Sequence, residues 1–353
     1  MRYSPSPVDA AQIKSRARDL GLDAIGITTA DPARHADFYR QWTAAGKAGE
    51  MAWLAREPDR RSDPARVLPG ARSIIVAGLN YWQPQPAGRG RIARYALGDD
   101  YHEILLEKLT TLAQEITAAG AHTASGAAAK VYVDTGPVLE KPLAERAGLG
   151  WQGKSTMLIS TRLGPWLLLG EILTTLELAP DAPQNDHCGK CTRCLDACPT
   201  RAITAPYQLD ARRCIAYLTI ELKGSIPEEM RPLIGDRVYG CDECLDVCPW
   251  NRFAQTTREA RFHAPPRDTS RDHLHDLLEI TPQEFKRRFA KSPILRVKRR
   301  GLVRNACVVL GNIGTSADLP ALRRAENHDE PLVREHASWA VRQIEQRSAK
   351  AQL

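Results

Sequence analysis

The sequence predicts a protein of mixed α+β or α/β class, in which an α/β domain at residues 1–180 precedes a small domain at 181–255. A linker at 256–279 then leads to a helical region at 280–353. Three observations support this prediction. Short β-branched runs alternate with amphipathic segments in the first part, cysteine, proline and glycine become frequent in the second, and helical periodicity returns in the third.

In the first part, strand and helix patterns alternate along the chain. Continuous apolar, β-branched runs predict strands, and apolar residues at helical spacing predict helices. The expected strands are 24–28, 73–77, 130–133 and 166–173, and the expected helices are 8–20, 101–119 and 138–147.

In the last part, apolar residues recur at helical spacing in 301–310, 319–325 and 332–344. Two of these segments share a theme, because Leu-Val-Arg is followed in each by alanine and further apolar positions. This similarity favours HEAT-like helical repeats, although two copies also fit an ordinary helical bundle.

The composition is that of a globular protein, with 43% hydrophobic and 26% charged residues among 353. No run approaches the roughly 18 apolar residues that a membrane-spanning helix requires. The first residues, Met1–Pro5, lack an apolar signal segment, so we expect a cytoplasmic protein. The sequence shows no obvious dimer interface, so we expect a monomer. The net charge of +7 favours an acidic partner such as nucleic acid.

Eight of the nine cysteines lie between Cys188 and Cys248, and the ninth, Cys307, sits in an apolar helical pattern typical of a small buried residue. Dense cysteines in a long chain without a signal segment favour metal over disulfides.

The spacing of these cysteines is C-x2-C-x2-C-x3-C-P, followed by a second half that ends in Cys248-Pro249. In bacterial two-cluster ferredoxins the fourth cysteine of such a run binds the other cluster. The pattern therefore predicts a ferredoxin-like domain with two 4Fe-4S clusters, where zinc knuckles would use pairs of C-x2-C. The expected ligands are Cys188, Cys191, Cys194 and Cys248 for cluster one, and Cys198, Cys214, Cys241 and Cys244 for cluster two.

Residues 148–155 spell G-x-x-x-x-G-K-S, the pattern of a phosphate-binding loop. Such a loop needs a strand before it and a helix after it, whereas here a helix precedes and a strand follows. Asp100 and His102 likewise resemble the D-x-H-x-x-G signature of proteins that bind cobalt through histidine, but Leu105 replaces the glycine. We expect no nucleotide site, and we expect Asp100 to cap a helix.

Several segments together resemble the epoxyqueuosine reductase family over most of the chain. They are Arg94-Tyr95, Asp100-Tyr101-His102, Val133-Asp134-Thr135-Gly136, Ala144-Glu145-Arg146-Ala147-Gly148, the Cys188–Pro199 run, and Tyr239-Gly240-Cys241-Asp242. The resemblance implies an oxidoreductase that converts epoxyqueuosine to queuosine at the wobble position of tRNA, the last step of queuosine biosynthesis. It also implies base-off cobalamin with no histidine on cobalt, in an N-terminal cobalamin-binding domain, and an unidentified reductant such as a flavodoxin or ferredoxin system.

The resemblance assigns the general acid to Asp134. An ordinary aspartate has a pKa of about 3.9, so burial beside the corrin would have to raise the pKa of Asp134. From the residues alone, an aspartate before Gly136-Pro137 also fits a simple turn. By the same matching, the residues expected at cobalamin are Arg61, Asp134, Lys154, Leu158 and Asp242.

Basic residues crowd the start of the helical region, where they could neutralise tRNA phosphates or simply form a solvated face. The residues expected to bind tRNA are Lys223, Arg296, Lys298, Arg299, Arg300 and Arg304. Three rival hypotheses are a cobalamin-dependent reductive dehalogenase, a plain iron–sulfur electron carrier, and an RNA-binding protein whose clusters are structural.

Overall fold

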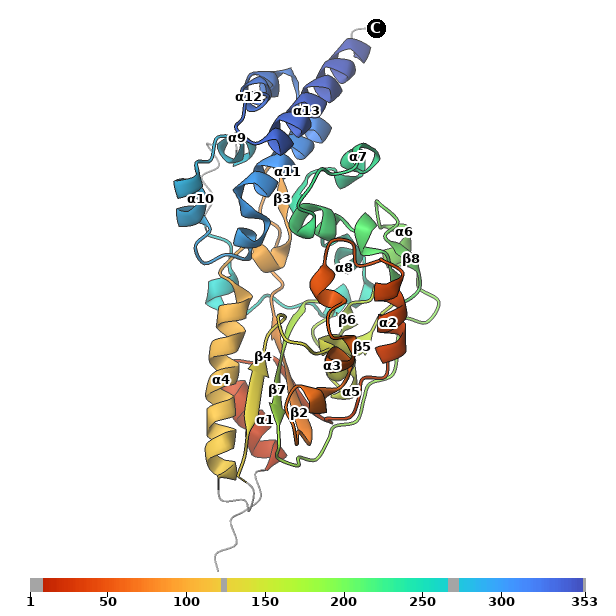
Figure 1. Ribbon diagram of the computed structural model, residues 1–353, viewed down its shortest axis with the longest axis vertical. Helices are drawn as coiled ribbons and strands as arrows, with labels where there is room; N and C mark the ends of the chain where they lie inside the picture. Colours follow the sequence, from red (N-terminus) through yellow and green to blue (C-terminus); the bar gives the residue numbers. More distant parts are fainter. Residues whose placement is uncertain (1–8, 122–125, 266–272, 352–353) are drawn as a thin grey trace, which may run out of the picture.

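The computed structural model describes residues 9–121, 126–265 and 273–351. A central sheet lies beside the long helix α4, the cysteine-rich segment lies against one side of this unit, and the C-terminal helices stand at its upper end (Figure 1). No helix within the described ranges has the length and apolar character that crossing a membrane requires.

The central sheet has four antiparallel strands in the order β1-β2-β7-β4. Their bounds are Ala24–Thr29 for β1, Ser73–Asn80 for β2, Leu167–Thr174 for β7 and Ala129–Tyr132 for β4. All eight residues of β2 are buried, because helices cover both faces of the sheet. This explains why β2 reads as a continuous apolar run rather than an alternating one.

Successive side chains of β2 point to opposite faces of the sheet. Ile75 and Ala77 pack against α1 (Ala10–Asp19) and α4 (Tyr101–Gly120), whereas Ile74 and Val76 pack against α5 (Glu140–Arg146). Glu171 of β7, which is discussed below, lies on the face of the sheet that packs against α5.

The predicted strands and helices of the first part form, with their ends displaced by a few residues. Asp100 caps α4 as expected, because its carboxylate accepts the amide proton of His102. Residues 148–155 are not a phosphate-binding loop, since α5 precedes them and the short strands β5 (Trp151–Gln152) and β6 (Leu158–Ile159) follow. The sequence did not predict α2 (Ala36–Ala44) or α3 (Pro58–Ser62).

The cysteine-rich segment is built from short elements. They are α6 (Arg193–Asp196), β8 (Ile203–Ala205), β9 (Gln208–Leu209), a π-helical turn (Tyr217–Glu221), α7 (Arg231–Ile234), β10 (Arg237–Tyr239) and α8 (Glu243–Asp246). Strand β10 pairs in parallel with β3 (Arg91–Ile92), which ties this segment to the first part of the chain.

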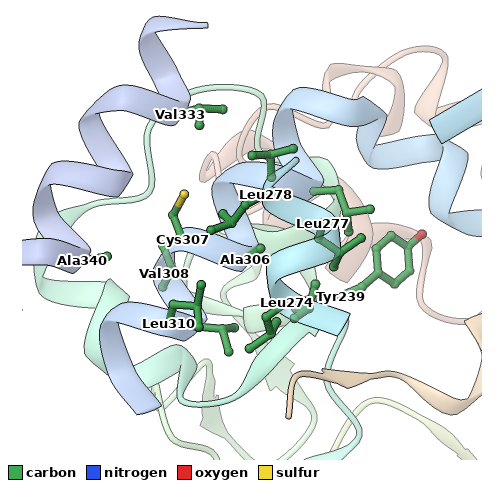
Figure 2. Packing of buried hydrophobic residues seen from close by; sticks show 14 of the residues in the cluster. Tyr239, Leu274, Leu277, Leu278, Ala306, Cys307, Val308, Leu310, Val333 and Ala340 are labelled. Atoms are coloured by element: carbon green, nitrogen blue, oxygen red, sulfur yellow. The ribbon is translucent and has the colours of Figure 1, made fainter. Parts of the chain in front are cut away.

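The C-terminal region is helical. Its helices are α9 (His273–Leu278), α10 (Pro282–Arg288), α11 (Lys298–Ile313), α12 (Leu319–Ala325) and α13 (Pro331–Lys350). Helix α11 lies at the centre, and Cys307 is fully buried on it, as the sequence predicts (Figure 2). The same core includes Tyr239 of β10 and Leu274 of α9, so the predicted linker contributes buried leucines to it.

Candidate active site and cluster sites

Cys188, Cys191, Cys194 and Cys248, from two distant parts of the chain, line one cavity of about 240 Å3. Cys244 also lines this cavity, as do Lys154, Ile159, His187 and Trp250. Burial raises the pKa of the Cys248 thiol, and the negative charges of Cys188, Cys194 and Cys191 raise it further. These four thiols are therefore close neighbours in space.

The remaining four cysteines form a second, more deeply buried group. Burial raises the pKa of Cys244 well above its usual value, and the charges of Cys214, Cys241 and Cys198 add to this effect. Each group thus combines three cysteines from one half of the motif region with one from the other, which is the pairing that the spacing predicts.

Thiols are the ligands that iron–sulfur clusters take, and two sets of four suit two cubes. In the part of the chain that the structure describes, no three His, Cys, Asp or Glu side chains are placed to bind a single metal ion. The group of Cys188, Cys191, Cys194 and Cys248 lines a cavity rather than converging on one point.

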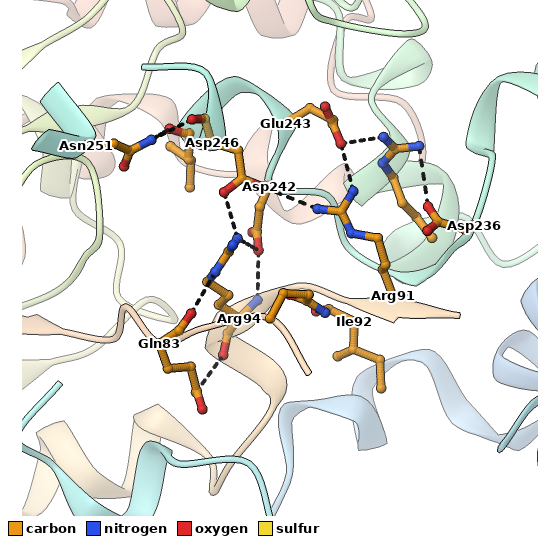
Figure 3. A network of polar contacts seen from close by, with 12 residues as sticks. Gln83, Arg91, Ile92, Arg94, Asp236, Asp242, Glu243, Asp246 and Asn251 are labelled. Atoms are coloured by element: carbon orange, nitrogen blue, oxygen red, sulfur yellow. Dashed lines mark hydrogen bonds and ion pairs between the residues drawn. The ribbon is translucent and has the colours of Figure 1, made fainter. Parts of the chain in front are cut away.

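A buried ion-pair network holds the loop and helix that carry the second half of the cysteines (Figure 3). The carboxylate of Asp242 accepts hydrogen bonds from the backbone N–H of Arg94 at 2.9 Å and from its guanidinium at 3.1 Å. Arg94 also pairs with Asp246 at 2.9 Å. Burial raises the pKa of Asp242 to about 6. Asp242, expected at cobalamin, is therefore engaged by Arg94, and its side chain positions α8.

Asp134 follows the end of β4 and adopts a left-handed backbone conformation, with φ of 56°. Its side chain is 58% exposed. The Nε2 atom of His102 lies 3.2 Å from Oδ2 of Asp134, and the other ring nitrogen, Nδ1, lies 2.6 Å from Oδ1 of Asp100. Both nitrogens of His102 are thus engaged by carboxylates.

In this structure the pKa of Asp134 is lowered. The hydrogen bond from His102 lowers the pKa of Asp134, and the charges of Lys141 and Arg296 act in the same direction. Burial lowers the pKa of His102, but its bonds to Asp100 and Asp134 outweigh burial and raise that pKa to about 9. At neutral pH the proton of the His102–Asp134 pair therefore resides on His102.

Two further acids lie behind Asp134. The backbone N–H of Asp134 donates to Oε1 of Glu140 at 2.7 Å, and Glu140 begins α5. Glu140 is within hydrogen-bonding distance of Glu171, a fully buried residue of β7. Sequence reasoning did not single out either residue, although a glutamate inside the apolar run of β7 is an unusual feature that could have found Glu171.

The other residues expected at cobalamin occupy different places. The guanidinium of Arg61 donates to the carbonyls of Gly136 and Trp53, so it braces the turn after Asp134. Leu158 is buried in β6. The ammonium of Lys154 donates to the carbonyls of Gly189 and Cys191, which places this side chain at the first cysteine group.

Arg296 is the one predicted tRNA-binding residue whose charge acts on Asp134 among the described residues. Its guanidinium pairs with Glu221 at 2.9 Å and lies 4.8 Å from the ring centre of Trp53. Lys298, Arg300 and Lys223 are exposed. Arg299 is partly buried and pairs with Asp329 at 3.1 Å.

Arg304 does not belong to an exposed basic surface. It is fully buried, and its guanidinium donates to the carbonyls of Leu222, Gly224 and Leu218. Burial lowers the pKa of Arg304 to about 10. It holds the loop that carries Lys223, because it donates to carbonyls of both the π-helical turn and this loop.

Comparison with known families identifies two matching segments. A 4Fe-4S double cluster binding domain matches residues 187–251, and a family described as epoxyqueuosine reductase QueG, DUF1730, matches residues 61–135. The first match covers all eight clustered cysteines, and the second includes Asp134.

Known relatives align along nearly the whole chain. An epoxyqueuosine reductase from Xanthomonas campestris pv. campestris is 45% identical, over 96% of this chain and 97% of that protein. One from Pseudomonas aeruginosa is 41% identical, over 96% of this chain and 95% of that protein. A solved structure of epoxyqueuosine reductase with an epoxyqueuosine-modified tRNA stem loop is 34% identical and superposes with a TM-score of 0.86, covering 95% of this chain and 89% of that one.

Proposed function

This chain belongs to the epoxyqueuosine reductase family, and we propose that it reduces epoxyqueuosine to queuosine at the wobble position of tRNA anticodons. It is an oxidoreductase. The observation that carries the proposal is the position of Asp134, which interacts with Lys141 beside the second cysteine group and with Arg296 on the basic side.

The electron path we propose runs from cluster one, held by Cys188, Cys191, Cys194 and Cys248, to cluster two, held by Cys198, Cys214, Cys241 and Cys244. Lys141 supports the second part of this path. Its ammonium, whose pKa burial lowers, interacts with Glu140 and Asp134 and also with the thiols of Cys244 and Cys214. The second group therefore adjoins the Asp134 site, while the first lines a cavity that Cys244 of the second group also lines.

We propose base-off cobalamin as the group between cluster two and the substrate, with no histidine on cobalt. His102 supports this, because carboxylates engage both of its nitrogens and leave neither free for a metal. Backbone of the 154–160 loop, together with Arg61, Leu158 and the Asp242 loop, would hold the corrin. When bound, cobalamin supplies a strongly reducing metal for opening the epoxide.

The epoxide oxygen leaves as water, which takes up two protons with the two electrons, and the chain itself supplies one of these protons. We assign this step to Asp134, which is exposed to the site, with His102 as the group that holds the proton at neutral pH. Transfer along the 3.2 Å contact from Nε2 of His102 to Oδ2 of Asp134 would load the acid when substrate arrives.

For tRNA we propose a surface formed by Lys223, Arg296, Lys298 and Arg300, with Arg299 at its edge. These cations can neutralise phosphates, while specificity comes from a single base that approaches Asp134. The C-terminal helices that present them have the character of HEAT-like repeats, two of which would start at the Leu-Val-Arg segments of α11 and α13.

The test is a conversion assay. Protein purified without oxygen and reconstituted with iron, sulfide, cobalamin and a reductant should convert epoxyqueuosine in tRNA to queuosine. We propose that the same reaction takes place in the cytoplasm. A reductive dehalogenase would instead act on an organohalide, an electron carrier would convert neither substrate, and a purely structural role for the clusters would leave tRNA binding without conversion. Intact clusters with no conversion would remove the proposal.

A further inference from the structure

Glu171 is a buried acid that the reaction described so far does not use. It lies in the middle of β7, on the face of the sheet that packs against α5, and its side chain has no exposed surface. Within the described residues, neither carboxyl oxygen receives a hydrogen bond from an N–H or O–H donor. An ionised carboxylate in such a place would carry a large desolvation penalty, so Glu171 must hold a proton.

The neighbour that can share this proton is Glu140. The two carboxyl groups lie within hydrogen-bonding distance, one on β7 and the other at the first position of α5. Two carboxylates in contact and away from water cannot both ionise, but one proton between them makes a strong hydrogen bond. This arrangement leaves the second oxygen of Glu140 free to accept another bond.

That second bond goes to the loop that carries the proposed acid. Oε1 of Glu140 accepts the backbone N–H of Asp134 at 2.7 Å. Asp134 has a left-handed backbone, which is strained for a non-glycine residue and persists only when neighbouring groups hold it. Arg61 braces the same turn from the other side through the carbonyl of Gly136.

We propose that Glu140 and Glu171 are positioning residues for the reaction, a pair with one shared proton whose free Glu140 oxygen fixes the backbone of Asp134 so that its carboxyl faces His102 and the substrate. The pair contacts neither substrate nor cofactor, and it acts only through Asp134. This inference rests on the proposed function for its kinetic test, whereas its spectroscopic test is independent of any turnover.

The charged groups around the pair set its pH dependence. The charges of Asp134 and Lys141 act on Glu140. The charges of Glu140 and Asp134 act on Tyr101 of α4. His102 and Arg296 act on Asp134. Burial and the charge of Asp134 raise the pKa of Glu140 to about 7, and burial raises that of Glu171 well above the usual range. Above about pH 7 Glu140 is therefore an anion and accepts a strong hydrogen bond from the Asp134 amide. Below about pH 7 Glu140 is protonated and this hydrogen bond weakens.

The kinetic test compares Glu140→Ala with Glu140→Gln, in protein with both clusters intact. Glu140→Ala removes the acceptor and should lower kcat by about tenfold with an unchanged KM for tRNA. Glu140→Gln keeps an oxygen acceptor and should retain kcat within about threefold, but the decline of kcat below about pH 7 should vanish. Glu115→Ala, an exposed change on α4, is the matched control and should leave kcat as in the wild type.

The spectroscopic test needs neither tRNA nor cobalamin. The infrared spectrum of the cluster-loaded wild type should contain a protonated carboxylic acid band near neutral pH, which Glu171→Gln should abolish. An active wild type together with an unimpaired Glu140→Ala, or with a Glu140→Gln as slow as Glu140→Ala, would overturn the inference while leaving the proposed function standing. Persistence of the infrared band in Glu171→Gln would also overturn it. An inactive wild type would instead count against the proposed function.

Discussion

The ring nitrogen Nε2 of His102 lies 3.2 Å from the carboxylate oxygen Oδ2 of Asp134, and this pair carries one proton at neutral pH. Two segments bring it together, because His102 lies in the first turn of the long helix α4 and Asp134 follows the strand β4 at the edge of the sheet. An isolated aspartate would be a poor proton donor at pH 7, whereas an aspartate beside a protonated histidine can receive a proton from it.

His102→Gln should separate the two members of this pair. The pKa of His102 is raised to about 9, so the wild type keeps the shared proton below that pH and single-turnover rates should fall as pH rises through about 9. Without the imidazole, Asp134 alone holds the proton, and the decline should begin at a lower pH. The measurement is the single-turnover rate against pH, and an unmoved profile would contradict a role for His102.

Asp134→Asn should abolish conversion while the iron content and the affinity for tRNA remain those of the wild type. Asparagine keeps the size of the side chain and the backbone N–H that Glu140 accepts, but it supplies no acidic proton. Turnover, iron content and tRNA affinity should be measured on the same preparation. Undiminished turnover in this variant would show that another group protonates the oxygen.

The buried Arg94–Asp242 pair should be essential for holding the second half of the cysteines. Arg94→Ala leaves the carboxylate of Asp242 buried without its cation, a loss of about 3–5 kcal/mol in similar cases. We expect a lower Tm and loss of iron. Arg72→Ala removes an exposed ion pair with Glu177 and should cost no more than about 1 kcal/mol. Equal effects of the two changes would contradict the structural role of Arg94.

The stability of the protein should fall as pH rises from about 5 to 8, in part because of Glu171. Its pKa is raised well above the ordinary value, so over this range the folded state holds a proton that the unfolded state has already released. Glu171→Gln removes this contribution. Urea unfolding at about pH 6 and pH 8 should show a smaller pH dependence in the variant, and an equal dependence would mean that Glu171 is not protonated in the folded protein.

Replacing Lys298 and Arg300 together with alanine should weaken tRNA binding and reduce its salt dependence by about one to two counterions. Both side chains are exposed, whereas Arg299 is already paired with Asp329. The matched control replaces Arg66 and Arg72, two exposed arginines, of which Arg72 lies at the end of the sheet away from Asp134. If the control changes the salt slope as much, the binding surface lies elsewhere.

The sequence predicted much of this molecule because its strongest patterns are local. The spacing of the cysteines predicted two groups of four, and continuous apolar runs predicted the strands of the sheet. Arg304 was misassigned because it follows a run rich in arginine and lysine, yet the residues from Gly301 to Gly311 around it are all buried. Arg304 is buried because it lies on the inner face of α11. The charge composition of the segment does not reveal which face of the helix is buried.

The acids behind Asp134 could not be placed from sequence. Glu140 follows Asp134 by six residues, but only the turn between β4 and α5 brings its carboxylate to the Asp134 amide. Glu171 lies more distant in sequence, on β7, opposite Tyr132 in the sheet. The sequence likewise does not show that His102 reaches Asp134, a contact that lowers the pKa of Asp134.

The most direct test of the central claim follows the clusters during one reaction. Protein loaded with cobalamin is reduced, freed of excess reductant, and mixed rapidly with tRNA that carries epoxyqueuosine, while the absorbance of the clusters is recorded. The account predicts that the clusters are reoxidised as queuosine forms, with about two electrons withdrawn per queuosine, and that tRNA already carrying queuosine leaves them reduced. Clusters that stay reduced with the epoxide substrate would contradict the account.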